Sequence, residues 1–391
     1  MIFATPALPA DYQQVIDNID ELRQTLKSTT SDSIRRWKGF IARMTYARAI
    51  RASNAIEGIE VSLDDAVAAV DREEPLKPQD ENWLALVGYR EAMDYIIQLA
   101  NDQSFQYNSG TILAMHFMMM KYDLTKHPGR WRPGDMEVIN QATGQVVYKA
   151  PSAELIPSLM DELFQNLNAT DSSHVIVRAA MAHLNMAMIH PFKDGNGRMS
   201  RAIQTMALSR EGILSPVFSS IEEYVGRHSE QYYEALAAVG QGSWHPQRDA
   251  LPWIRFCLTA HYYQAQTLLR RISEMDRLIE NLEKEIDKRK LNDRVMYALV
   301  DAAVGLSVKN PTYRKQVDIS DQLAKLDLQT LVNSNFLVAK GERRWRHYVA
   351  SDELKKIRAQ SRMPEQIIDP FIELDNQRTQ RQAELPGISQ P

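Results

Sequence analysis

The segment from His190 to Arg201 reads His-Pro-Phe-Lys-Asp-Gly-Asn-Gly-Arg-Met-Ser-Arg, and it decides the fold. An almost wholly apolar segment, residues 175–189, precedes it, and a helix-forming segment, residues 199–208, follows it. The run therefore joins two predicted helices. It combines a proton acceptor, a carboxylate, a Gly-X-Gly turn and two guanidinium groups, which few structural needs require together but phosphate chemistry does.

The side chains of this run have distinct chemical uses. Pro191 ends the preceding helix and leaves His190 at its mouth, where a neutral imidazole can accept a proton from a hydroxyl. Asp194 offers a hard oxygen ligand suited to Mg²⁺ that is shared with substrate phosphates. Arg198 and Arg201 lie three residues apart on one side of the next helix, so both can bind phosphate oxygens.

The backbone of the run suits an anion. Gly195-Asn196-Gly197 permits backbone angles that other residues avoid, so successive N–H groups can point inward. The helix that begins there adds its positive N-terminal end. A glycine-rich turn with surface arginines and a capping histidine would explain any one feature, but not the combination. The residues therefore predict a site for phosphoryl or nucleotidyl transfer.

The run resembles the signature of the Fic family, His-Pro-Phe-x-(Asp/Glu)-Gly-Asn-Gly-Arg-x-x-Arg, and departs from it at no fixed position. The resemblance implies an all-α core that transfers AMP from ATP to a Ser, Thr or Tyr hydroxyl of a target protein. It implies these roles: general base (His190), Mg²⁺ ligand (Asp194), holders of the α- and β-phosphates (Gly195, Asn196, Gly197), contacts to the β- and γ-phosphates (Arg198, Arg201) and loop anchor (Phe192). Gly197 favours AMP transfer, because the related Doc-type kinases carry a bulkier residue there and bind ATP reversed.

Two other segments extend the resemblance. Residues 137–140 and 145–148 are β-prone runs around a Thr143-Gly144 turn and predict a hairpin. In the Fic family this hairpin, residues 137–148, is the flap that docks the target segment. Residues 231–236, with Tyr232 and Tyr233, resemble the helix that closes over the adenine. The alternative is that both tyrosines belong to a helix that only packs against the core and has no role in adenine binding.

A second pattern of the family, (Ser/Thr)-x-x-x-Glu-(Gly/Asn), matches residues 53–58. Alone it is weak, since a chain of this length yields it by chance about 0.3 times. By resemblance, Glu57 pairs with Arg201 and occupies the arginine that the γ-phosphate needs, while Ser53 tethers an inhibitory helix over about 43–58. The alternative is that Glu57 is a solvated residue at a helix end.

His183 lies seven residues before His190, on the same face of the predicted helix. A second metal ligand or base is conceivable there. We expect a core histidine with satisfied hydrogen bonds instead.

Composition points to a globular protein of two or three domains in 391 residues, with a net charge of −4. The single cysteine, Cys257, excludes an intramolecular disulfide, fits a reducing compartment and is expected to be a buried thiol. We find neither a signal peptide nor an apolar run that could span a membrane, and we expect a cytoplasmic protein.

Helical periodicity predicts helices over 11–28, 35–52, 81–101, 110–120 and 153–167, with a loop at 72–80.

The expected fold class is mainly α: a Fic-type helical core with a short β-hairpin flap, and a small C-terminal winged helix-turn-helix domain. The expected divisions are an N-terminal helical region (1–105), the catalytic core (106–260), a connecting helix (261–292), the winged-helix domain (293–352) and a tail (353–391). Within the winged-helix domain we expect helices at 295–304, 318–325 and 327–333 and a hairpin of 336–338 with 346–349. From residue 376 the tail is polar, and we expect it to be mobile.

A heptad-like seam, Leu268 to Ile286, predicts a long helix that packs on its own domain or forms a dimer contact.

The favoured function is an autoinhibited protein adenylyltransferase that uses ATP and Mg²⁺. A second hypothesis transfers another phosphate-containing group or removes AMP. A third is a DNA-binding regulator with a basic wing (Lys340, Arg343, Arg344, Arg346), although three aspartates weaken it (Asp318, Asp321, Asp327); winged helices also bind proteins.

Overall fold

The computed structural model describes residues 1–32, 35–75, 80–140, 143–169, 173–210, 218 and 220–384. The fold is mainly helical, as the sequence predicts. The chain forms two compact units. Unit 1 comprises residues 1–266 and 367–391, and unit 2 comprises residues 267–366.

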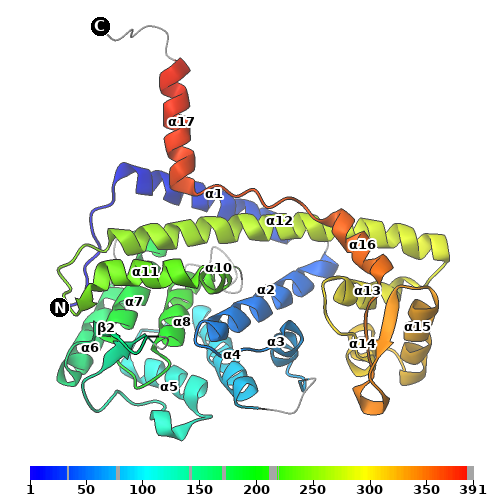
Figure 1. Ribbon diagram of the computed structural model, residues 1–391, viewed down its shortest axis with the longest axis horizontal. Helices are drawn as coiled ribbons and strands as arrows, with labels where there is room; N and C mark the ends of the chain where they lie inside the picture. Colours follow the sequence, from blue (N-terminus) through cyan, green and yellow to red (C-terminus); the bar gives the residue numbers. More distant parts are fainter. Residues whose placement is uncertain are drawn as a thin grey trace. The chain divides into compact units, whose positions relative to one another are not determined.

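Unit 1 contains most of the helices (Figure 1), and the predicted ones are confirmed within a few residues. Two short helices, α3 and α10, were not predicted. Part of the predicted loop at 72–80, residues 76–79, lies outside the described residues. The helices are α1 (Ala10–Asp32), α2 (Arg35–Ala55), α3 (Leu63–Val70), α4 (Glu81–Ala100), α5 (Ser109–Met120), α6 (Ile156–Asn168), α7 (Val175–Ile189), α8 (Asn196–Ser209), α10 (Glu222–Arg227), α11 (Ser229–Gly240) and α17 (Pro370–Glu384).

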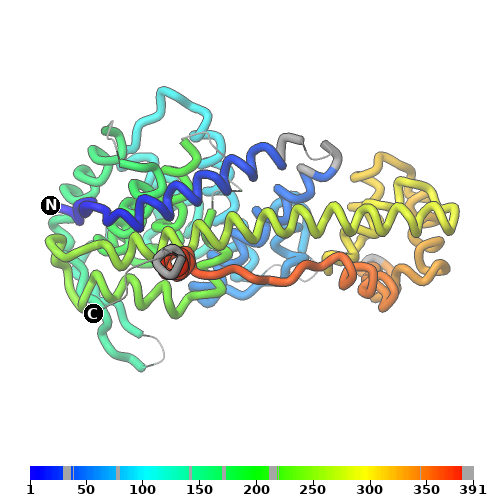
Figure 2. The backbone as a smooth tube through the Cα atoms, turned by 90° about the horizontal axis from the view of Figure 1, so that it is seen from above, coloured from blue at the N-terminus to red at the C-terminus, as the bar shows by residue number. Residues whose placement is uncertain are grey.

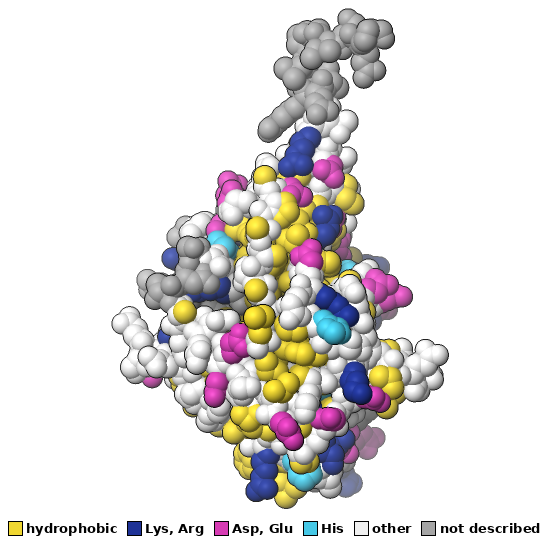
Figure 3. All heavy atoms as spheres, turned by 90° about the vertical axis from the view of Figure 1, so that its left-hand side faces the viewer, with side chains coloured by type: hydrophobic (Ala, Val, Ile, Leu, Met, Phe, Trp, Pro, Cys, Tyr) yellow, Lys and Arg dark blue, Asp and Glu magenta, His cyan; other side chains and the backbone are white. Residues whose placement is uncertain are grey.

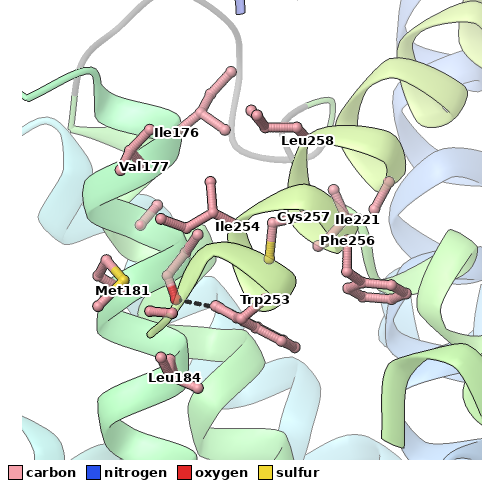
Figure 4. Close-up of a cluster of buried hydrophobic side chains, with 14 of the residues drawn as sticks. Ile176, Val177, Met181, Leu184, Ile221, Trp253, Ile254, Phe256, Cys257 and Leu258 are labelled. Atoms are coloured by element: carbon pink, nitrogen blue, oxygen red, sulfur yellow. Dashed lines mark hydrogen bonds between the residues drawn. The ribbon is translucent and has the colours of Figure 1, made fainter. Parts of the chain in front are cut away.

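Helices α7 and α8 form the centre of unit 1 and pack against each other. A helix that is buried almost all round needs apolar residues on every face, which explains why α7 is almost wholly apolar. The long helix α12 (Leu251–Arg289) packs its first part against α7. Figure 4 shows this contact, where Trp253 Nε1 donates to the Ala180 carbonyl at 2.7 Å and Cys257 is buried beside it.

The N-terminal helix α1 contributes to the same core. Tyr12, Val15, Ile16 and Ile19 belong to one buried cluster with the first part of α12, and α1 follows that helix in Figure 2. The stripe of apolar residues that predicted α1 is therefore the face it buries.

A small sheet lies next to α7. Its strands are β1 (Glu137–Ile139), β2 (Val146–Lys149) and β3 (Gly242–Ser243), in the order β1-β2-β3. β1 and β2 are antiparallel and confirm the predicted hairpin, with residues 141–142 outside the described residues, whereas β3 pairs parallel to β2 and was not predicted. The Tyr148 hydroxyl donates to the Met188 carbonyl at 2.9 Å, which fixes β2 on α7.

Unit 2 has the order helix, helix, helix, hairpin: α13 (Met296–Ala303), α14 (Asn310–Val317), α15 (Asp321–Asn333), β4 (Leu337–Lys340) and β5 (His347–Ala350), followed by α16 (Asp352–Ser361). Two predicted helices are wrong. Residues 318–325 and 327–333 are not separate, because no helix-breaking residue divides them and α15 runs through both. Asp318 instead ends α14 in a left-handed conformation, and Ser320 caps α15.

The heptad-like seam lies on α12, and its six apolar residues are buried within the chain. Polar groups of the same helix pair with α16: Glu274 with Arg358 at 3.0 Å, and Asn281 with Ser361 at 3.2 Å. The seam therefore packs on its own chain, the first of the two predicted alternatives.

The predicted mobile tail is wrong for residues 376–384, which belong to helix α17. Phe371 and Leu374 are buried, and the ring of Phe371 packs edge-on against Tyr12 with 5.0 Å between centroids. These apolar anchors precede the polar stretch on which the prediction rested. Residues 385–391 lie outside the described part of the chain.

None of the described helices combines the length and apolar character needed to cross a membrane. On the face drawn in Figure 3, apolar side chains form a band below the C-terminal helix, and acidic and basic side chains are interspersed around it.

Four histidines of unit 1 predict acid sensitivity. Burial lowers the pKa of His183 and His261 to about 3, and that of His116 and His190 to about 4. Between about pH 6.5 and 4 these histidines bind more protons in the unfolded chain than in the folded chain, so their contribution to stability is complete above pH 6.5 and is lost as the pH decreases. Burial raises the pKa of Glu222 to about 7, so this carboxyl group adds stability as the pH decreases, but it is a single group and the histidines with the opposite effect are four.

Urea denaturation at about pH 7.5, 6 and 5 should therefore give a midpoint that decreases with the pH. A midpoint that stays constant, or increases, toward pH 5 would contradict this expectation.

Candidate functional site

His190 ends helix α7 in a left-handed conformation, with φ 50° and ψ 56°. Its Nδ1 lies 3.2 Å from the Ala187 carbonyl, and because a carbonyl only accepts, Nδ1 carries the hydrogen. Nε2 then keeps its lone pair. Burial lowers the pKa of His190 to about 4, so the ring is neutral near pH 7 and can accept a proton at Nε2.

The loop after His190 is braced by its own residues. Both amide atoms of the Asn196 side chain bind the backbone of Phe192, at 2.9 Å and 2.8 Å. Gly195 has φ 77° and precedes α8, so the first N–H groups of α8 lack partners within the helix. The side chain of Asn196 is thus occupied by the loop, and only backbone N–H groups are offered to an anion here.

Arg198 is 2% exposed, yet its guanidinium group is poorly satisfied. Nη2 donates to the Met120 sulfur at 2.9 Å, while Nε and Nη1 have no hydrogen-bond partner among the described residues. A buried cation without an anionic partner is costly. This arrangement is what a site for a phosphate oxygen provides.

Arg201 is 1% exposed and is held by the end of helix α2. Its Nε donates to Ser53 Oγ at 2.8 Å, and its Nη2 donates to the Ser53 carbonyl at 2.9 Å and to Glu57 Oε1 at 2.7 Å. Nη1 has no partner in the described part of the chain. The structure thus brings together the three residues that the sequence pattern joined.

The turn after α2 sets the position of Glu57. The Ile59 N–H donates to the Asn54 carbonyl and the Gly58 N–H to the Ala55 carbonyl, with Gly58 at φ 77°, which is a Schellman motif. The Glu57 carboxylate lies against Gly197, and a Cβ atom added at residue 197 would overlap Glu57 Oε1. Glycine at 197 therefore leaves room for the Glu57 carboxylate as well as for an anion.

The two tyrosines of α11 differ. Tyr232 is buried, accepts or donates a hydrogen bond with His183 Nε2 at 3.1 Å and packs edge-on against Trp253, so it belongs to the core. Tyr233 is 51% exposed, and its hydroxyl donates to the Ile56 carbonyl at 3.5 Å, at the end of the α2 segment. His183 is a buried histidine with both nitrogens bonded, the second to Gln204 at 2.5 Å, as expected.

Two residues of the site escaped the sequence analysis. Arg132 donates from Nε to the His190 carbonyl at 2.9 Å and from Nη2 to the Pro151 carbonyl at 2.5 Å. His116 contacts the loop at Asp194 from helix α5. Both act on backbone atoms of residues far along the chain, and no local sequence pattern marks such a contact.

Asp194 is the candidate metal ligand. Its Oδ1 accepts from the Gly195 N–H at 2.6 Å, and its Oδ2 lies 3.1 Å from Lys126 Nζ. No group of three potential protein ligands occurs among the described residues. Mg²⁺ commonly takes only one or two carboxylates and completes its shell with phosphates and water, so a single partly exposed carboxylate fits this ion if Lys126 withdraws.

The fold and the site define a helical domain built around a loop that follows a neutral histidine and precedes two buried arginines. Residues 106–208 match the sequence pattern of the Fic/DOC family. This part of the chain is a Fic domain.

Curated relatives extend the similarity beyond that segment. A protein adenylyltransferase Fic of Nematostella vectensis is 28% identical over 257 residues, 65% of this chain and 55% of the relative. Protein adenylyltransferase fic-1 of Caenorhabditis elegans is 25% identical over 261 residues, 64% of this chain and 46% of the relative. The chain spans about half the length of the curated relatives it matches.

Solved structures agree on the fold. A Fic family protein from Desulfovibrio desulfuricans superimposes with a TM-score of 0.57 at 22% identity, over 89% of this chain and 98% of its own. Fic-1 from Caenorhabditis elegans gives a TM-score of 0.53 at 20% identity, over 68% and 73%.

The tautomer of His190 can be measured directly. In ¹⁵N-histidine NMR spectra, assigned by difference with His190→Ala, we expect the hydrogen on Nδ1 and a ring that stays neutral down to about pH 5. A titration of His190 near pH 6.5 would contradict the burial that lowers its pKa.

Proposed function

We propose that this chain is an autoinhibited protein adenylyltransferase, which transfers AMP from ATP to a Ser, Thr or Tyr hydroxyl of a target protein and of itself. The observation that carries the proposal is the set of unsatisfied donors around the loop. Arg198 is buried, two of its nitrogens have no partner among the described residues, and it lies next to the N-terminal N–H groups of α8. The names of the relatives from Nematostella vectensis and Caenorhabditis elegans support the same activity.

The proposed chemistry needs one proton acceptor and several charge partners. His190 Nε2 takes the proton of the target hydroxyl as its oxygen forms a bond to the α-phosphorus. The bond between the α-phosphorus and the α,β-bridging oxygen breaks, and pyrophosphate leaves. The Gly195 N–H is bound to Asp194 Oδ1, so the backbone N–H groups of residues 196 and 197, together with Arg198, would neutralise the negative charge on the phosphates. Asp194 would hold Mg²⁺, which supplies further neutralisation when bound.

The target segment would dock on the hairpin. Strand β1 is at the edge of its sheet, so its free backbone groups can pair with an extended segment of another protein. Ile139, Val146 and Val147 are exposed on this hairpin and offer apolar contacts to the same segment. Because backbone pairing carries little sequence information, the sequence of the target stays open.

Glu57 would be the brake. Its carboxylate binds Arg201 and lies against Gly197, where the γ-phosphate and the phosphate-binding backbone would otherwise meet. Ser53 holds the same guanidinium group through its hydroxyl and its carbonyl. A shift of the α2 end would release Arg201 for the nucleotide, so inhibition and activity depend on the same side chain. Tyr233, whose hydroxyl reaches Ile56, would border the adenine, whereas Tyr232 supports it from the core.

Glu57→Gly should raise auto-modification from α-labelled ATP by about ten- to hundredfold, the factor expected for removal of one charge-assisted hydrogen bond of ~1.5–3 kcal/mol. Glu60→Gly is the matched control, because Glu60 is exposed and three residues further along the same segment. Equal labelling of the parent and Glu57→Gly proteins would reject the brake.

His190→Ala in the Glu57→Gly background should lower labelling by at least about a hundredfold, since general-base catalysis contributes this much. Label from α-position ATP, and none from γ-position ATP, identifies AMP as the transferred group. Label from the γ-position would favour phosphate transfer, and loss of AMP from a labelled protein would favour AMP removal.

Unit 2 carries a second candidate function, nucleic-acid binding. Lys340, Arg343 and Arg346 are exposed on the hairpin and its turn, while the side chain of Arg344 is outside the described residues. On α15, however, Lys325 pairs with Asp321, which leaves little basic charge there. A homodimer through the α12 seam is not proposed, because that seam is buried.

If unit 2 binds duplex DNA, affinity should fall steeply between about 50 and 200 mM salt, as counterion release requires. Lys340→Glu with Arg346→Glu should abolish binding, and Lys284→Glu with Lys355→Glu should not. No mobility shift at low salt would exclude this function.

A cytoplasmic location is supported by the single cysteine, because a reducing compartment suits a protein without an intramolecular disulfide.

A further inference from the structure

His116, on helix α5, joins two backbone segments that are distant in sequence. Its side chain is fully buried. Nδ1 accepts from the Gly129 N–H at 2.9 Å, and Nε2 lies 3.0 Å from the Asp194 carbonyl oxygen. Since an N–H only donates and a carbonyl only accepts, the two contacts require Nδ1 without hydrogen and Nε2 with it.

The contact with Asp194 reaches the carboxylate of the same residue. His116 holds the carbonyl end of the peptide bond between Asp194 and Gly195, and the N–H end of that bond donates to Asp194 Oδ1 at 2.6 Å. A peptide group held at both ends has a fixed plane. The position of the Asp194 carboxylate therefore follows from the donor on His116, and the two successive hydrogen bonds polarise each other.

Packing leaves this arrangement little freedom. The imidazole stacks on the Phe192 ring, with 3.7 Å between centroids and 10° between planes. A Cβ atom at Gly195 would lie 3.0 Å from the Met120 sulfur and 3.5 Å from His116 Nε2. Met120 in turn contacts Arg198. Helix α5 is thus the platform on which the loop rests.

We propose that His116 is a positioning residue, which sets the Asp194 carboxylate and the start of the anion-binding loop by donating from Nε2 to the Asp194 carbonyl. It touches neither the nucleotide nor the transferred group. The inference rests on the proposed AMP transfer for its activity readout, but not for its structural readout.

Two amide substitutions separate the two hydrogen bonds. The amide of glutamine reaches the position of Nε2 and keeps the donor to Asp194. The amide of asparagine reaches only the position of Nδ1 and keeps the acceptor for Gly129. Each variant loses one hydrogen bond to the backbone, so a merely structural role predicts similar losses of stability and activity for both.

In the Glu57→Gly background, we expect His116→Asn to lower kcat for auto-modification by about ten- to hundredfold, and to raise the Mg²⁺ concentration that gives the half-maximal rate. His116→Gln should keep kcat within about threefold, with a thermal midpoint similar to that of His116→Asn. Equal kcat losses in the two variants, or losses that parallel their thermal midpoints, would overturn the proposal.

The unsubstituted full chain gives an independent measurement if either variant fails to fold. In ¹⁵N-histidine NMR spectra, His116 should carry its hydrogen on Nε2 and none on Nδ1, and this tautomer should be unchanged from about pH 6 to 8. A hydrogen on Nδ1 would overturn the proposal. Absence of AMP transfer in the Glu57→Gly parent would reject the proposed function alone, because the tautomer is read without turnover.

Discussion

The structure depends on the burial of two arginines side by side on the first turns of α8. Arg198 and Arg201 are both almost completely excluded from solvent, and a buried guanidinium group needs partners for its donors. Arg201 finds them in Ser53, at the end of α2, and in Glu57, in the turn that follows, whereas Arg198 keeps two nitrogens unpartnered in the described part of the chain. The two arginines therefore differ: Arg201 has a carboxylate partner within the protein, whereas two nitrogens of Arg198 have no hydrogen-bond partner among the described residues.

Arg201 also lies near a buried pair of polar side chains outside the loop. The Tyr89 hydroxyl donates to the Glu222 carboxylate, both side chains are fully buried, and the positive charge of Arg201 favours the ionised form of each. Helices α2, α4, α8 and α10 supply these side chains and pack against one another. Movement of the α2 end would therefore disturb a polar network as well as one ion pair.

The loop itself is held mainly by side chains that form hydrogen bonds with its backbone. Asn196 braces Phe192, Arg132 binds the His190 carbonyl, and His116 binds the Asp194 carbonyl. Buried backbone groups must find partners, and here the partners come from side chains because the loop has no regular structure. The same contacts that satisfy the backbone also orient the histidine and the carboxylate.

A helix with a strong apolar stripe, such as α1, was predictable from the sequence because periodicity is local. The hairpin followed from its β-prone runs and turn, and the loop chemistry from twelve consecutive residues. The boundaries in unit 2 were less predictable: no residue between 321 and 333 breaks the helix, and the end of α14 depends on a left-handed Asp318. The C-terminal helix was missed because its anchors, Phe371 and Leu374, become apolar contacts only when α1 lies beside them.

The amino-acid sequence alone predicts which residues suit phosphate chemistry, because a base, a carboxylate, glycines and arginines lie within one run of twelve residues and their chemistry is intrinsic. How these side chains are arranged is visible only in the folded domain. The tertiary structure shows that Asn196 serves the loop, that Tyr232 is a core residue, that Glu57 lies over Gly197, and that His116 and Arg132 belong to the site. Each of these depends on distances between segments far apart in the chain, which burial and hydrogen-bond satisfaction establish only when the whole domain has packed.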